Sequence, residues 1–222
     1  MTARYVSELA YPETIAALRE MGDTIVIVPA AAGSIVSAPV VSAPVADHAD
    51  LYHCRLGIAD NAPVIHALPG DLASGYPAEA AFNAVCTGRF FLHNRKITNR
   101  RLLAAAEAAG LTLVHVPQGY ARCSAIPVSE TAIITYDHGI AKAASAAGLS
   151  VLVTSPCHVL LPGYDTGFLG GTSGNLNGEV LLFNGDLSRH PDFQAVTDFV
   201  SARGLTCRWI PGKPLRDIGS II

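Results

Sequence analysis

Cys123 is the residue of this sequence best suited to covalent chemistry. It lies between the loop Gln118–Tyr120 and a predicted strand at Ser124–Val128, where a side chain would point into a central cavity. A thiol becomes a nucleophile when a nearby cation or helix N-terminus lowers its pKa. Arg122 is adjacent in sequence, but neighbours in a strand point to opposite faces. The competing interpretation is a small buried thiol that fills a tight space in the core.

Two histidines are candidates for general acid–base catalysis beside such a thiol. His138 follows Asp137 at a predicted helix start, and His190 precedes another. Each has a simpler alternative, because His138 suits an exposed first turn and His190 can cap its helix. His48 and His53 have no partner at metal-ligand spacing, and neither HxH nor HExxH occurs. We therefore expect no metal and no cofactor.

The segment Gly163–Gly174 is dense in glycine and contains one carboxylate, Asp165. It lacks the Gly-Lys-Ser/Thr of a phosphate-binding loop and the GxGxxG of a dinucleotide fingerprint. Its backbone N–H groups can form an anion cradle, and the alternative is close packing that only glycine permits. Because Asp165 has little to pack against, we predict that it grips a cationic substrate group.

Polar residues far apart in the chain are expected to meet at one place. Asp217 and Ser220 lie in a predicted terminal strand, and their side chains can approach the same axis as Asn83, Cys123 and Ser173. This convergence is the site hypothesis. In this hypothesis Asn83, Ser173, Asp217 and Ser220 bind the substrate together with Asp165. The hypothesis fails if these side chains are dispersed in the structure.

Composition limits the classes of function. The chain has 222 residues, of which 50% are hydrophobic and 15% charged, and its formal net charge is −3. These values are typical of a compact globule and give no reason to expect nucleic acid or a membrane as partner. Five scattered cysteines without CxxC spacing indicate reduced thiols. We expect a cytoplasmic protein with one domain, residues 1–222, that binds a small polar metabolite; its oligomeric state stays open.

The elements that must position these residues are predicted from a repeat. Three times a helix ends in Gly-Leu and leads into a short apolar strand, at Gly110-Leu111, Gly148-Leu149 and Gly204-Leu205. The second and third repeats are preceded by two strands around a polar turn, which predicts ββαβ modules. The spacing leaves room for roughly five modules, so the chain ends can meet and close a ring that hides sheet edges.

The N-terminal part is predicted with less regularity. A helix is expected over Pro12–Met21, a buried strand over Thr24–Val28, and a hairpin from Leu51–Gly57 and Pro63–Ala67. The stretch Pro29–Ala46 contains "SAPV" twice and is interpreted as a loop with one edge strand at most.

Several of these motifs together resemble an uncharacterised bacterial family, the DUF6873-like proteins, assigned to the pentein fold. The motifs are Gln118–Ser124, Asp137 with Gly139, Gly163–Gly174, His190–Asp192 and Asp217–Ile221. The resemblance covers most of the chain from about Tyr76 onward. It implies an α/β fold, namely a five-fold pseudosymmetric α/β propeller of pentein type built from ββαβ modules.

The wider superfamily includes arginine and agmatine deiminases, dimethylarginine hydrolase, amidinotransferases and a non-catalytic ribosome anti-association initiation factor. Its enzymes resemble one another in using a cysteine near the C-terminus, a histidine acid/base and carboxylates that grip a guanidinium group. This chain departs from that pattern. Lys213–Ile222 has no cysteine, so the usual nucleophile position is filled by Gly219 or Ser220, and Cys207 lies in a strand expected to be buried.

Two functions remain open from the sequence. The first is a cysteine-dependent hydrolase or transferase that acts on a C–N bond of a guanidino- or amidino-like metabolite in an axial cavity. The second is a non-catalytic pentein-fold binding module, which the missing C-terminal cysteine favours. A protein-interaction scaffold is a third possibility and would require a large exposed apolar patch.

Overall fold

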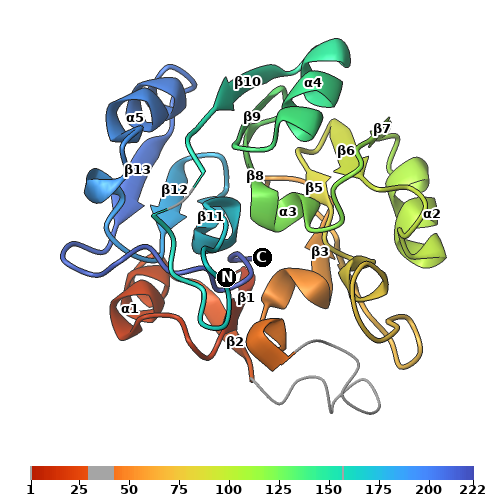
Figure 1. Cartoon of the computed structure of the whole chain (residues 1–222), viewed down its shortest axis with the longest axis horizontal. Helices are drawn as coiled ribbons and strands as arrows, with labels where there is room; N and C mark the ends of the chain where they lie inside the picture. The colour runs from red at the N-terminus through yellow and green to blue at the C-terminus, as the bar shows by residue number, and fades with distance from the viewer. Residues whose placement is uncertain (1, 30–42, 157) are drawn as a thin grey trace.

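The protein is a mixed α/β structure of small sheets and short helices (Figure 1). The computed structural model describes residues 2–29, 43–156 and 158–222, so most of the predicted loop Pro29–Ala46 lies outside the described residues. Five separate sheets of two or three strands occur in this part of the chain. None of its helices is both long and apolar enough to cross a membrane.

Three of the sheets have the predicted ββαβ order. In each, an antiparallel pair is followed by a helix and by a third strand that runs parallel to the second. The first comprises β5 (Val85–Cys86), β6 (Phe90–His93), α2 (Arg100–Ala108) and β7 (Thr112–His115). The second comprises β8 (Ala125–Ser129), β9 (Ala132–Thr135), α4 (His138–Ala146) and β10 (Ser150–Val153). The third comprises β11 (Ser173–Leu176), β12 (Val180–Phe183), α5 (Phe193–Ser201) and β13 (Thr206–Trp209).

Local sequence explains where these helices begin and end. Asn99 caps α2 by accepting from two backbone N–H groups, and Asp137 caps α4 through Ile140 N at 2.9 Å. Each helix then ends before a glycine with positive φ, which is the left-handed conformation that stops a helix. The following leucine enters the next strand, so the Gly-Leu repeat is confirmed as the junction between helix and parallel strand.

The remaining two sheets are formed by the N-terminal part. Strand β1 (Ala3–Ser7) runs parallel to β2 (Thr24–Val28) across helix α1 (Pro12–Glu20), and β3 (His53–Arg55) pairs antiparallel with β4 (Val64–His66). The C-terminal residue joins β1, because Tyr5 and Ile222 exchange backbone hydrogen bonds of 2.8 and 3.1 Å. The two ends of the chain therefore lie side by side, as Figure 1 shows.

Two predictions about strands are wrong in detail. Thr24–Val28 is a strand but not a buried one, since Val26 and Ile27 are 38% and 45% exposed. Among the described residues it pairs only with β1, and because Val26 and Ile27 are neighbours, their exposed side chains lie on opposite faces of the strand. Asp217 and Ser220 lie in an irregular terminal segment rather than in a strand, and Ser220 has a φ of +65°.

Apolar residues join each sheet to its neighbour. Along β9, Ile133 packs with the β5–β7 sheet and α4, whereas Ile134 packs with β12 and α5. This alternation follows from the period of two in a strand, which buries both faces of the sheet. Figure 1 shows α1, α2, α4 and α5 toward the outside and the short helix α3 (Ala121–Ser124) near the middle, beside the chain ends.

Candidate functional site

Helix α3 places Cys123 in the interior. The sequence predicted that this residue opens a strand, but it belongs to one buried helical turn that precedes β8. The side-chain oxygen of Asn83 holds the turn by accepting from the backbone N–H groups of Arg122 and Cys123 at 2.7 and 3.2 Å. The Arg122 guanidinium donates to the carbonyls of Ala125, Gly170 and Ser173, which ties α3 to the third sheet.

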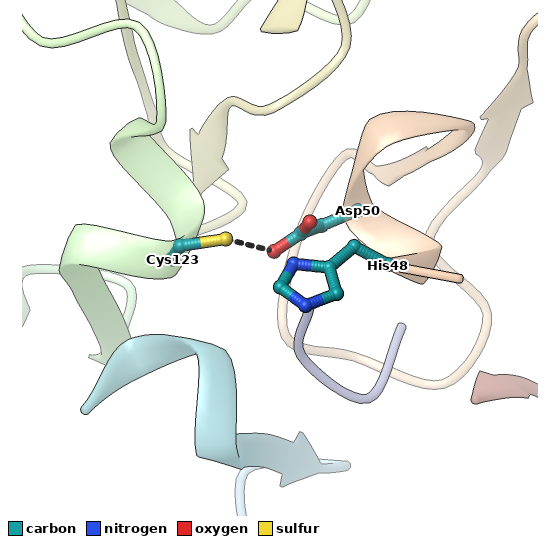
Figure 2. A group of neighbouring side chains, drawn as sticks. All are labelled: His48, Asp50 and Cys123. Atoms are coloured by element: carbon teal, nitrogen blue, oxygen red, sulfur yellow. Dashed lines mark hydrogen bonds between the residues drawn. The ribbon is translucent and has the colours of Figure 1, made fainter. Parts of the chain in front are cut away.

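The Cys123 thiol faces the carboxylate of Asp50 (Figure 2) and also the amide of Asn83. Cys123 Sγ donates to Asp50 Oδ2 at 2.9 Å and accepts from Asn83 Nδ2 at 3.4 Å. Ser220 Oγ also donates to Asp50 Oδ2, at 2.8 Å. The second carboxylate oxygen, Asp50 Oδ1, is buried and has no hydrogen-bond partner. One carboxylate thus organises two side-chain donors and keeps one oxygen unpaired.

Asp50 and His48 come from one short segment that packs against the C-terminus. Asp50 lies in the 3₁₀ helix η3 (Ala49–Leu51), and its backbone N–H donates to Gly219 O at 3.0 Å. Gly219 has a φ of +64°, and a Cβ there would lie 2.2 Å from His48 Cβ, so only glycine fits. His48 is 3% exposed. Donor atoms of His48, Asp50 and Cys123 all lie within 4.8 Å of one another.

Asp217 supplies a second buried carboxylate. It accepts from the backbone N–H groups of Phe168 and Gly219 at 2.9 and 3.0 Å, and its Oδ1 lies 3.9 Å from His48 Nδ1. Burial raises the pKa of Asp217, while His48 and the two N–H donors partly oppose that shift. Asp217 therefore lies beside the imidazole of His48, beyond hydrogen-bond distance but close enough to stabilise a positive charge on the ring.

The glycine-rich segment packs directly on these residues. A Cβ at Gly171 would lie 1.9 Å from Asp217 Oδ1, and one at Gly170 would lie 2.4 Å from Cys123 O. No side chain can be accommodated at such distances. The packing interpretation of Gly163–Gly174 is therefore confirmed at these two positions: glycine lets the third sheet approach the thiol and its carboxylates.

A cavity of about 80 Å³ opens beside the cluster. His48, Cys123 and Asp217 contribute polar atoms to its wall, and the rest of the lining is largely aromatic and aliphatic: Val45, Tyr120, Leu161, Tyr164, Thr166 and Phe168. Tyr164 is 50% exposed and lies toward solvent. One water molecule needs roughly 10–15 Å³ of such a cavity, so there is room for a small planar group or for several waters.

The electrostatics of the site favour the neutral thiol. Burial, and after it the charges of Asp50 and Asp217, raise the pKa of Cys123 well above its usual value, which the Asn83 amide opposes. Arg122 supplies one positive charge near Asp50. With both carboxylates ionised and one guanidinium nearby, the site carries an excess of negative charge, which a cationic ligand would neutralise.

The structure brings together four of the residues that the sequence proposed. Asn83, Cys123, Asp217 and Ser220 converge as expected. Ser173 is buried nearby, but its hydroxyl donates to Gly170 O at 2.9 Å rather than to the thiol cluster.

Three other candidates lie elsewhere. Asp165 is exposed and is not part of the cavity wall. His138 is the exposed first residue of α4 and makes no contact with Cys123. His190 is buried at the end of the 3₁₀ helix Leu187–Arg189, where its Nδ1 accepts from Asp192 N at 3.1 Å. This bond holds the backbone just before α5, but the N-cap residue of that helix is Asp192 and not His190.

Sequence reasoning missed His48 and Asp50. Asp50 lies 73 positions before Cys123, and no spacing rule connects residues so far apart. His48 was considered only for metal spacing along the chain and set aside. The one local signal was a His-x-Asp pair directly before a predicted strand, at a point where polar side chains often serve a site.

Comparison with known proteins identifies the family but no activity. The family described as "Family of unknown function (DUF6873)" matches residues 64–222, well over half of the chain, and the protein belongs to it. No curated protein matches the sequence. The thiol, Asn83, Asp217 and Ser220 lie within the matched residues, whereas His48 and Asp50 precede them.

Proposed function

Because the family to which this chain belongs has no assigned activity, we propose a function from the site itself. The protein is a cysteine-dependent hydrolase or transferase that acts on a C–N bond of a small amidino- or guanidino-like metabolite. One observation carries the proposal: the Cys123 thiol donates to Asp50 at 2.9 Å, with the His48 imidazole in the same cluster, on the wall of a cavity.

The cluster supports a covalent route. Cys123 Sγ would attack the amidine carbon, forming a C–S bond, while its proton passes through Asp50 or His48 to the leaving nitrogen. Cleavage of the C–N bond releases an amine or ammonia and leaves a thioimidate on the enzyme. Water, or an acceptor amine in a transferase, then attacks the same carbon and returns the thiol.

The charges around the thiol support a cationic substrate. Asp50 and Asp217 can each accept hydrogen bonds from an amidinium or guanidinium group, and such charge-assisted bonds are the strong ones. The rings of Tyr120 and Phe168 on the cavity wall suit a delocalised cation. A positive charge at this place would also lower the pKa of the Cys123 thiol, because it opposes the two carboxylates.

We also propose that residues 1–222 form one pentein-type propeller. Three ββαβ units, two further sheets and the Tyr5–Ile222 pairing support five modules that close where the ends meet. The proposed nucleophile comes from a different segment than in the related enzymes. Ser220, near the C-terminus, donates to Asp50 instead of attacking substrate.

The alternative function is a non-catalytic receptor for the same cations. The observation that favours it is the burial of Cys123, which is 2% exposed and whose pKa burial raises. If the thiol stays neutral when a ligand is bound, it does not attack that ligand, and the cavity then serves for binding alone.

Affinity labelling separates the two functions. 2-Chloroacetamidine and 2-chloroacetamide carry the same alkylating carbon, but only the first is cationic. We expect the amidine to label Cys123 at least about tenfold faster than the amide, the effect of one charge-assisted hydrogen bond. Cys207, a half-buried thiol far from this cluster in the fold, serves as the internal reference in the same mass-spectrometric digest.

Turnover is then measured with a panel of guanidino and amidino compounds, by release of ammonia or amine. Cys123→Ser should abolish release, and His48→Ala should slow it by roughly 10²–10⁴-fold, whereas His138→Ala should leave it unchanged. Absence of release from every compound would refute the enzyme, and amidinium binding that survives Cys123→Ser would then establish the receptor. Equal labelling by both reagents, with no release, would argue against both functions.

A further inference from the structure

The donor atoms around Cys123 have a composition that suits a metal ion as well as an organic cation. His48, Asp50 and Cys123 offer one nitrogen, one oxygen and one sulfur, all within 4.8 Å of one another and all buried. This is the only such group of three in the part of the chain that the structure describes. Mixed nitrogen, oxygen and sulfur donors select Zn²⁺ and similar thiophilic ions over Mg²⁺ or Ca²⁺.

A second observation is independent of the cluster's composition. Asp50 is 1% exposed, and its Oδ1 has no hydrogen-bond partner. A buried carboxylate oxygen without a partner costs free energy. A cation between Asp50 and Cys123 would bind Oδ2, the oxygen that accepts from the thiol, and bidentate coordination by the carboxylate would also give Oδ1 a partner.

The distances require only a small adjustment. In a tetrahedral zinc site with Zn–S of about 2.3 Å and Zn–O or Zn–N of about 2.1 Å, neighbouring ligand atoms lie about 3.6 Å apart. The Cys123 Sγ to Asp50 Oδ2 distance is 2.9 Å and would open slightly when the ion replaces the thiol proton. The widest separation, at most 4.8 Å, would close by about 1 Å.

Outer contacts are present to hold the ligands. Ser220 Oγ donates to Asp50 Oδ2 at 2.8 Å, and Asp217 Oδ1 lies 3.9 Å from His48 Nδ1. The Ser220–Asp50 hydrogen bond is the kind of outer contact that orients a ligating carboxylate, and Asp217 would need to approach the free ring nitrogen of His48 to act in the same way. Because His48 and Cys123 line the cavity, an ion bound to them would have a fourth position open toward it, as in zinc sites with three protein ligands.

We propose that His48, Asp50 and Cys123 bind one Zn²⁺ ion and that the ion and an amidinium cation compete for this place. Coordination transfers the thiol proton to solvent and leaves the sulfur bound to the metal. The competition rests on the proposed function, whereas the metal site does not. Cys123 cannot be a ligand and a nucleophile at once, so zinc would hold the proposed enzyme inactive.

Binding is tested on the full chain with Co²⁺ and Zn²⁺ as probes. A Co²⁺–thiolate bond gives a charge-transfer band in the near ultraviolet, and we expect one Co²⁺ per chain with this band, displaced by Zn²⁺. His48→Ala should weaken binding at least about 100-fold, and Ser220→Ala about tenfold, as for loss of an outer-sphere partner. Cys123→Ser should remove the band.

Two other groups can bind metal and need control variants. His53 and His66 approach each other with their Nδ1 atoms 2.9 Å apart, and Cys54 and Cys86 with their sulfurs 3.6 Å apart. His66→Ala and Cys86→Ser should leave the band and the stoichiometry unchanged. A band that disappears in Cys86→Ser but persists in His48→Ala would overturn the assignment, as would the absence of any band in the unaltered protein.

Competition has its own readout. Zn²⁺ at one equivalent should slow the labelling of Cys123 by 2-chloroacetamidine at least about tenfold, and a chelator should restore it. If the band is present but labelling is unaffected, the metal site stands and the competition fails. If no compound is turned over but the band is present, the proposed enzyme fails and the metal site still stands.

Discussion

Replacing Asp50 with asparagine should change the reactivity of Cys123 in opposite directions for neutral and cationic reagents. The substitution keeps the side chain's shape and an acceptor oxygen for Ser220, but it removes the charge that lies 2.9 Å from Cys123 Sγ. In the unaltered protein that charge opposes the thiolate. Its removal therefore favours the thiolate and weakens the attraction for cations.

The size of the effect follows from the distance. Two unit charges 2.9 Å apart interact by about 6 kcal/mol at an effective dielectric constant of about 20. Relaxation of the side chains reduces this, but even a quarter of it is a factor of about ten in the thiolate population. We expect Asp50→Asn to raise the rate of alkylation of Cys123 by neutral chloroacetamide at least about tenfold at pH 7.

The assay follows both reagents by mass spectrometry of the Cys123 peptide. Chloroacetamidine labelling should lose its advantage over chloroacetamide in Asp50→Asn, and Asp198→Asn, on the exposed face of α5, is the control. Thermal unfolding checks that the variant is folded. If folded Asp50→Asn reacts with chloroacetamide no faster than the unaltered protein, the carboxylate does not hold the thiol neutral and the electrostatic argument is wrong.

Three further predictions follow from the same contacts. Asn83→Ala leaves the backbone N–H of Cys123 without its acceptor, and should destabilise the fold by about 1–3 kcal/mol in urea unfolding; an unchanged midpoint would contradict this role. Gly171→Ala places a Cβ 1.9 Å from Asp217 Oδ1, so it should cost about 1–3 kcal/mol and abolish amidine-selective labelling; retained selectivity would show that Asp217 is dispensable. Chloroacetamide labelling of the unaltered Cys123 should rise steadily from pH 7 to pH 9, because burial and two carboxylates raise its pKa; a plateau below pH 8 would contradict that cause.

Local signals in the sequence were sufficient for the modules. Helix caps, Gly-Leu junctions and turn residues act within a few positions of one another, and α2, α4 and α5 each end shortly before the glycine of a Gly-Leu pair, as predicted. The strand Thr24–Val28 was expected to be buried because β-branched runs usually are. The burial of this strand depends on which other elements pack against it. That is a property of the tertiary structure, and the residue types of the strand alone do not determine it.

The site was predictable only in part because its contacts cross the whole chain. Cys123, Asn83, Asp217 and Ser220 were found because the modules place them near one axis. Asp50 comes from an irregular segment whose position depends on the backbone contact with Gly219. Asp165 was favoured because a carboxylate among glycines looked unsupported, but those glycines serve the approach of another carboxylate, Asp217.

The arrangement makes the N-terminal part essential to the proposed chemistry. The family match begins at residue 64 and includes the thiol, whereas the carboxylate that receives its proton and the neighbouring imidazole come from His48 and Asp50. These two residues are held by Gly219, three positions from the residue that pairs with β1. The contact between the chain ends therefore also brings the proposed acid–base groups to the proposed nucleophile. A site assembled in this way is complete only when both ends are folded, which is a physical reason for placing it where they meet.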